Sequence, residues 1–237
     1  MAAWKIAPAL CAGCTVVLKP AEATPMTALA LARILDGIPD LPKGAVSVVT
    51  GDGPVVGALL AESDLVDKVA FTGSTRTGRA ILRAAADSNL KRVTLELGGK
   101  SPNIFFADAD WEAAVEGAVF GVFVNQGEVC SAGSRILVEK AIHAKFLDAV
   151  VAKAKTIRLG DPLDRDTRMG PLVTAAHRDR VIGYVEQEST KARSSCSVGA
   201  SRAARSRAVC LSSPRFSTAW IRACGSRRRR SSVRWFP

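Results

Sequence analysis

Short apolar segments alternate with amphipathic segments along the first hundred residues. The short segments favour extended chain and predict strands at 15–18, 46–49, 68–71 and 92–97. The segments between them carry apolar residues at helical spacing and predict helices at 25–36, 55–62 and 76–87. Thr24 is expected to cap the first of these helices, with Pro25 at its first position and Gly37 at its end. Strands and helices that alternate with short connections are typical of a doubly wound parallel sheet, so the sequence predicts an α/β fold.

The pattern changes after Gly98-Gly99, where we place a domain boundary. The chain then predicts, in order, a helix at 111–124 capped by Asp110, a loop at 125–130, a strand at 136–138 and an amphipathic helix at 144–157. Residues 99–188 are therefore expected to form part of a second α/β domain.

Charge is distributed unevenly along the chain. The net charge is +11, but twelve of the 33 Lys and Arg residues lie in residues 189–237, which contain no Asp or Glu. This segment also holds twelve serines and shows no lasting apolar periodicity. Such a composition cannot bury enough apolar surface to offset chain entropy, so we expect residues 189–237 to be a disordered basic tail.

The sequence favours a cytoplasmic protein without a metal site. No apolar run reaches the roughly 18–20 residues that a membrane helix needs, and the opening residues lack the basic start of an export signal. Cys11 and Cys14 form a lone C-x-x-C pair, which cannot supply the four ligands of a structural zinc site. A redox role needs such a pair at a helix N-terminus, whereas this one precedes a strand. We therefore expect two buried or half-buried thiols.

Glycines mark two candidate sites at the ends of predicted strands. Gly53 and Gly57 follow the second strand, but their spacing departs from the dinucleotide fingerprint and is weak evidence for a ligand. Gly73 would allow a close backbone approach, and the Ser74 hydroxyl follows it at a helix N-terminus, where N–H groups attract phosphate. An ordinary helix cap is the alternative for this second turn.

Charged residues at strand ends supply two further candidates. Lys19 and Glu22 follow the first strand and could bracket a ribose, although an exposed charged loop would have the same sequence. Glu96 lies in an apolar strand that is expected to be buried on both faces. Burial would make this carboxylate more basic, as a general base requires, and a salt-bridged structural carboxylate is the alternative.

Cys130 is the candidate nucleophile. It lies in a loop between Gly127 and Gly133, so its sulfur is expected to be accessible and its N–H unbonded. A single cysteine can equally be inert. Neither His143 nor His177 lies in a comparable turn, so a mechanism with a histidine base has no obvious candidate.

Six segments in order resemble motifs of the aldehyde dehydrogenase superfamily. Leu95–Pro102 is similar to its glutamate motif and Asn125–Arg135 to its cysteine motif. The other four are Lys19–Glu22, Phe71–Thr75, Gly160–Pro162 and Met169–Leu172. The resemblance extends from Met1 to about Gln187.

The resemblance implies oxidation of an aldehyde to a carboxylic acid with NAD(P). Cys130 would form a thiohemiacetal and then a thioester, Glu96 would activate the water that hydrolyses it, and the Cys130 N–H would supply half of an oxyanion hole. Residues 1–98 would be part of the NAD(P)-binding domain and 99–188 part of the catalytic domain. The cofactor residues would be Lys19 and Glu22 at the adenosine ribose, Gly53 and Gly57 beside the adenine, and Gly73 and Ser74 at the pyrophosphate.

Two alternatives to this function stay open. A relative that passes the thioester to CoA is one, although Glu96 favours hydrolysis. A fragment that binds nucleotide without catalysis is the other. NAD is expected to bind better than NADP, because the Glu22 carboxylate would repel a 2′-phosphate.

The sequence also departs from the family's pattern. A Pro-Trp-Asn segment upstream and a Glu-x-Phe-Gly-Pro segment downstream are absent, so we expect a truncated chain with little activity that does not assemble into the parent homo-oligomer. Residues 189–237 are interpreted as translation in a shifted frame. An incidental tail or a basic arm, with Trp220 and Trp235 stacking on bases, would be the alternatives, and no specific nucleic acid partner is expected.

Overall fold

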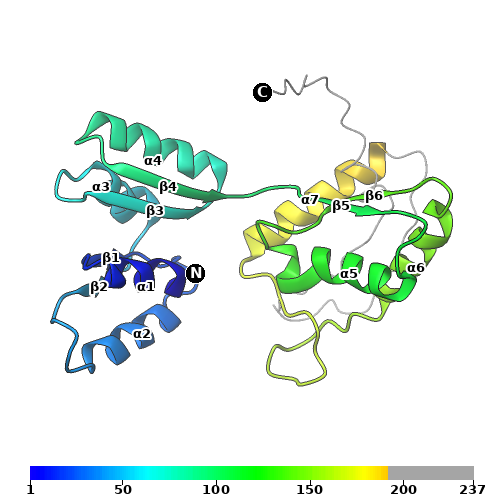
Figure 1. Ribbon diagram of the computed structural model, residues 1–237, viewed down its shortest axis with the longest axis horizontal. Coiled ribbons are helices and arrows are strands. Elements are labelled where there is room, and N and C mark those ends of the chain that lie inside the picture. Colours follow the sequence, from blue (N-terminus) through cyan, green and yellow to red (C-terminus); the bar gives the residue numbers. More distant parts are fainter. Residues whose placement is uncertain (192–237) are drawn as a thin grey trace. The chain divides into compact units, whose positions relative to one another are not determined.

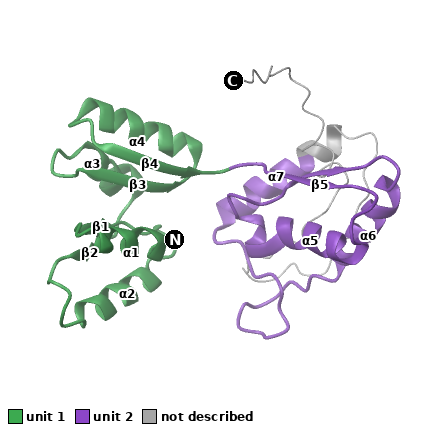
Figure 2. Ribbon diagram, in the orientation of Figure 1, with its two compact units in different colours: residues 1–98 green, residues 99–237 purple. Residues whose placement is uncertain are grey.

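The structure, a computed structural model, describes residues 1–191. The chain divides into two compact units, Met1–Gly98 and Gly99–Pro237, which Figure 2 shows in different colours. The predicted disordered tail lies, from residue 192 onward, outside the described residues. No helix within residues 1–191 is long and apolar enough to cross a membrane.

The first half of unit 1 is built on one parallel strand pair. Strand β1 (Val16–Leu18) pairs with β2 (Val46–Val48), and helix α2 (Met26–Asp36) connects them, as parallel strands require (Figure 1). Helix α1 (Ala3–Cys11) precedes β1 and contacts it. The sequence analysis did not predict α1 and considered its residues only as a possible export signal.

The second half of unit 1 repeats the same arrangement. A π-helical turn, η1 (Gly53–Gly57), leads into helix α3 (Ala58–Glu62) and strand β3 (Lys68–Gly73). Helix α4 (Thr75–Asp87) then crosses over to strand β4 (Arg92–Leu97), which lies parallel to β3 in register from Lys68 opposite Arg92 to Gly73 opposite Leu97. Gly78 of α4 permits close packing on this pair, because a Cβ there would lie 3.0 Å from Leu97.

Unit 2 contains a third parallel pair and its own core. Strand β5 (Pro102–Phe105) pairs with β6 (Arg135–Val138), and helix α5 (Trp111–Phe123) and the 3-10 turn η2 (Val124–Gly127) lie between them in the chain. Helices α6 (His143–Lys155) and α7 (Ala175–Lys191) follow. The core of unit 2 consists of buried apolar side chains from β5, α5 and α6: Phe105, Val115, Ala118, Val119, Phe146 and Val150.

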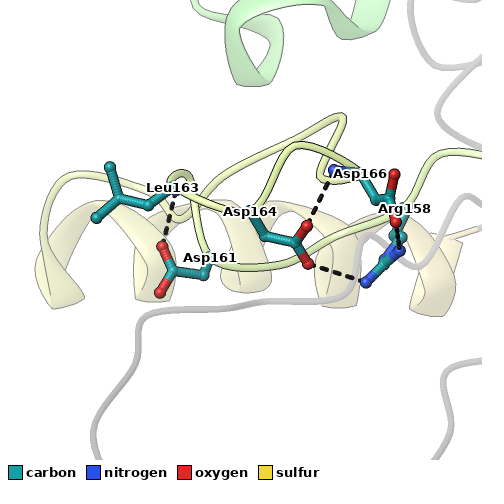
Figure 3. A network of polar contacts seen from close by, with 5 residues as sticks. All are labelled: Arg158, Asp161, Leu163, Asp164 and Asp166. Atoms are coloured by element: carbon teal, nitrogen blue, oxygen red, sulfur yellow. Dashed lines mark hydrogen bonds and ion pairs between the residues drawn. The ribbon is translucent and has the colours of Figure 1, made fainter.

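A polar loop joins α6 to α7. Arg158 forms ion pairs of 2.9 Å with both Asp164 and Asp166, and the Asp161 carboxylate accepts the N–H of Leu163 (Figure 3). Backbone bonds between Arg158 and Met169 close the base of this loop. Ion pairs within the loop therefore stabilise its conformation. The Leu163 side chain is exposed.

Most predicted elements are present, and the α/β class with parallel strands is confirmed. Within residues 1–191 the strands form three separate pairs. Asp110 caps α5 as expected, since its side chain accepts the N–H of Ala113. The prediction that Thr24 caps α2 is wrong, because the preceding position is Pro25 and no side chain caps this helix. Strand β5 was not predicted.

The expectation of buried cysteines at the C-x-x-C pair is also wrong. Cys11 ends α1, Cys14 lies in the turn that follows, and both thiols are free and exposed. They are exposed because the turn bonds back to the end of α1 and brings no other segment across the two side chains.

Candidate active site

The carboxyl ends of β1 and β2 bring together four of the predicted cofactor residues. The Lys19 ammonium lies 3.1 Å from Oε1 of Glu22, and the Gly53 N–H donates to the same oxygen over 2.5 Å. A Cβ at Gly53 would lie 3.3 Å from this oxygen, and one at Gly57 would lie 3.9 Å from Cδ of Lys19. The two glycines therefore leave room for the Lys19–Glu22 pair against the η1 turn.

A cavity of about 220 Å³ opens beside this pair. Its lining comes from the turns after the two strands and consists of Pro20, Ala21, Glu22, Pro25, Thr50, Gly51 and Asp52. The sequence analysis missed Thr50 and Asp52, although both follow a predicted strand at the edge where parallel sheets bind ligands. The lining of the cavity includes two carboxylates, those of Glu22 and Asp52, and the Thr50 hydroxyl.

The Glu22 carboxylate is held in its ionised form. Hydrogen bonds from its own backbone, from the Lys19 side chain and from the Gly53 N–H keep the pKa of the Glu22 carboxyl below its usual value. Glu22 therefore presents an acceptor, and not a donor, at neutral pH.

The turn from β3 into α4 has the geometry of a helix cap. The Ser74 hydroxyl accepts the N–H of Thr77 over 3.1 Å. A Cβ at Gly73 would overlap the ring of Phe71, so any other residue here would displace that ring. The turn exposes both Gly73 and Ser74 at the start of α4.

Glu96 lies on the exposed face of β4, so the expectation that it is buried on both faces is wrong. Exposure alternates along the strand, and the residues on either side, Leu95 and Leu97, face Gly78 of α4. Within unit 1, helix α4 covers the face of the β3–β4 pair that carries Leu95 and Leu97, and it does not cover the face that carries Glu96. Glu96 is opposite Thr72 in the strand register, and the Thr72 hydroxyl is buried without a hydrogen-bond partner within the described residues.

Cys130 is exposed, as the sequence predicted, and its thiol is free. Among residues 1–191 no group accepts a hydrogen bond from its N–H. Its carbonyl oxygen lies close to Gly99, where a Cβ would be only 3.1 Å away. Gly99 is three residues after Glu96 in the chain. The loop therefore presents a thiol and an N–H donor from the same residue.

The backbone before Cys130 has an unusual conformation. Asn125, Gln126 and Gly127 have φ angles of 51°, 56° and 77°. A left-handed conformation costs about 1–3 kcal/mol at each non-glycine residue and persists where the surroundings enforce it. The loop forms two internal bonds, from the Glu128 N–H to the Asn125 carbonyl and from the Asn125 amide to the Glu128 carbonyl.

Sequence analysis missed one residue at this loop. Nε2 of His177, in the first turn of α7, lies 2.9 Å from Oε1 of Glu128. No pattern in the sequence connects the two, since tertiary folding alone brings α7 to the loop. Nε2 of His177 thus faces a carboxylate two positions before Cys130.

Comparison with known proteins agrees with the motifs. The profile of the aldehyde dehydrogenase family matches residues 1–211. Retinal dehydrogenase 2 of Homo sapiens is 50% identical over 186 residues, which are 78% of this chain and 36% of that protein. Betaine aldehyde dehydrogenase of Bacillus subtilis is 50% identical over 185 residues, which are 78% of this chain and 37% of that protein.

Solved structures give the same result. Betaine aldehyde dehydrogenase of Staphylococcus aureus in complex with NAD⁺ matches with a TM-score of 0.78 and 42% identity, over 84% of this chain and 39% of that chain. The chain thus spans somewhat more than a third of the length of the relatives it matches. With its profile match, its relatives and its shared fold, the chain belongs to the aldehyde dehydrogenase family.

Proposed function

We propose that the protein oxidises an aldehyde to a carboxylic acid with NAD, through a covalent intermediate on Cys130. The observation that carries this proposal is the exposed Cys130 thiol next to its own unbonded N–H. Membership of the aldehyde dehydrogenase family supports it. The names of the relatives suggest retinal and betaine aldehyde as the first substrates to test.

Cys130 performs the first step. Its thiolate adds to the aldehyde carbon and forms a thiohemiacetal, and the Cys130 N–H stabilises the negative charge that develops on the oxygen. A preorganised donor of this kind typically contributes roughly 3–4 kcal/mol to the barrier. When bound, the nicotinamide cofactor supplies the acceptor for the hydride of this intermediate.

Glu96 acts on the thioester that remains. It takes a proton from a water molecule, which adds to the thioester carbon and releases the carboxylic acid from the Cys130 sulfur. Its location on the exposed face of β4 leaves the carboxylate accessible to water. Transfer to CoA would not need this base, which is why we favour hydrolysis.

The residues at the ends of β1 and β2 fit the adenosine half of a dinucleotide. The ionised Glu22 can accept hydrogen bonds from ribose hydroxyls, and the cavity of about 220 Å³ beside it can take part of a nucleoside. Gly53 and Gly57 keep the η1 turn free of side chains at this place. We assign the pyrophosphate to the first turn of α4, beside Gly73 and Ser74.

Glu22 also favours NAD over NADP. Its negative charge would repel a 2′-phosphate, and Lys19 at 3.1 Å reduces this repulsion only in part. Dissociation constants of the two cofactors test the assignment. Tighter binding of NADP than of NAD to the wild-type chain would contradict it. Glu22→Gln should reduce the difference between the dissociation constants of the two cofactors.

Formation of NADH with a panel of aldehydes tests the reaction. The wild-type chain is compared with Cys130→Ser. NADH formation should be at least about 10²-fold slower in this variant, because a hydroxyl is a weaker nucleophile than a thiolate. Cys14→Ser is the matched control and should leave the rate unchanged, since this thiol lies in the turn before β1. A Cys130→Ser variant as fast as the wild type would refute the proposal.

A further inference from the structure

The loop that carries Cys130 depends on contacts from outside because its own backbone is unfavourable. Asn125 and Gln126 both have left-handed φ angles, and the two bonds between Asn125 and Glu128 lie within the loop itself. A backbone of this kind persists where neighbouring structure fixes it. Contacts from other elements of unit 2 therefore decide the conformation in which Cys130 is presented.

One such contact joins the side chains of Glu128 and His177. The 2.9 Å contact joins a residue two positions before Cys130 to the first turn of α7. The backbone of His177 is fixed in turn, because its N–H donates to the Thr174 hydroxyl over 3.1 Å. The pair therefore connects the nucleophile loop to an anchored helix terminus.

The second ring nitrogen of His177 has a contact of its own. Nδ1 contacts Nη2 of Arg180. His177 thus lies between the Glu128 carboxylate and the Arg180 guanidinium, and the two contacts fix the orientation of its ring.

We propose that His177 is a positioning residue, which acts through Glu128 to hold the loop so that the Cys130 N–H faces the carbonyl oxygen of a substrate. The proposal rests on the function proposed above, in which this N–H stabilises the developing oxyanion. Polar contacts between partly exposed side chains contribute little to global stability. The effect of His177 is therefore on the geometry of the loop rather than on the folding of unit 2.

Two reagents separate the geometry of the loop from the reactivity of the thiol. With p-nitrophenyl acetate, the Cys130 thiolate adds to the carbonyl carbon, the bond to p-nitrophenolate breaks, and an acetyl thioester remains on the sulfur. This reaction passes through an oxyanion and depends on the N–H. Iodoacetamide alkylates the same sulfur by displacing iodide and forms no oxyanion. The ratio of the two rates at Cys130, measured by peptide mass spectrometry on the full chain, therefore reports the position of the N–H.

Loss of the contact between His177 and Glu128 should lower this ratio. We expect a decrease of about tenfold in His177→Ala and in Glu128→Ala, less than the complete loss of an oxyanion donor, and no further decrease in the double variant. His177→Gln should keep most of the ratio, because its side-chain amide can still donate to Glu128. His143→Ala is the matched control, since this histidine begins α6. An unchanged ratio in His177→Ala, or one that falls equally in His143→Ala, would overturn the proposal.

Hydrogen exchange keeps the proposal testable if the proposed function fails. If the ratio of acylation to alkylation in the wild type is no higher at Cys130 than at the exposed Cys11 and Cys14, the proposed function is contradicted. Hydrogen exchange of the amides in residues 124–130 then decides whether His177 positions the loop. We expect faster exchange of these amides in His177→Ala and no change in α5 and α6. Unchanged exchange in residues 124–130, or faster exchange throughout both helices, would overturn the proposal.

Discussion

Replacement of Gly99 by alanine should slow the reactions of Cys130 that depend on its N–H. A Cβ at Gly99 would lie 3.1 Å from the Cys130 carbonyl oxygen, which is a few tenths of an ångström inside ordinary van der Waals contact. The obstructing atom belongs to the backbone and cannot rotate away, so the peptide of Cys130 must move. Because a displacement of about 1 Å in an active site can cost about 10²-fold, we expect a loss of roughly threefold to tenfold.

Gly98→Ala is the matched control for this change, since a Cβ at Gly98 would meet no atom within 4 Å. Neither glycine has a positive φ, so alanine can adopt the backbone conformation at both positions. Because alanine also restricts the unfolded chain, it should raise the free energy of unfolding by about 0.4–1 kcal/mol where its Cβ meets no obstruction. The assay measures acylation of Cys130 by p-nitrophenyl acetate together with the thermal unfolding midpoint. Equal acylation rates in the two variants would refute the reasoning that the Gly99 contact positions Cys130.

Three further predictions concern charge and packing. Because the pKa of the Glu22 carboxyl is lowered in the fold, its ionised form stabilises the fold above the ordinary pKa, and this stabilisation is lost as the pH falls through the lowered pKa. The thermal unfolding midpoint of Glu22→Gln should therefore be below that of the wild type near pH 7, and the two midpoints should converge as the pH falls through the lowered pKa. The buried Lys91 donates to the Ala61 carbonyl over 2.7 Å, so Lys91→Met should lower the free energy of unfolding by about 1–3 kcal/mol in urea titrations. Phe146 is 2% exposed and stacks on Phe105, so Phe146→Ala should cost about 3–5 kcal/mol, whereas Phe120→Ala, at 66% exposure, should cost little.

The linear pattern of the sequence was sufficient for the local elements. Strand β4 and the cap of α5 by Asp110 follow from residues that are neighbours in the chain, because capping and strand propensity are local effects. The motifs around Glu96 and Cys130 were recognisable for the same reason. The accessibility of Cys130 was also predictable, since its loop is rich in glycine.

Tertiary structure alone decided burial and long-range contacts. The apolar sequence around Glu96 suggested a strand covered on both faces, yet α4 covers one face only, and a strand's composition does not specify how many layers pack on it. The Gly53 N–H reaches Glu22 from another strand end, and His177 reaches Glu128 from a helix far along the chain. Contacts of this kind depend on how the chain folds back on itself, and no local propensity encodes them. The sequence by itself thus identified the candidate residues for the chemistry, and the fold determined what holds them in place.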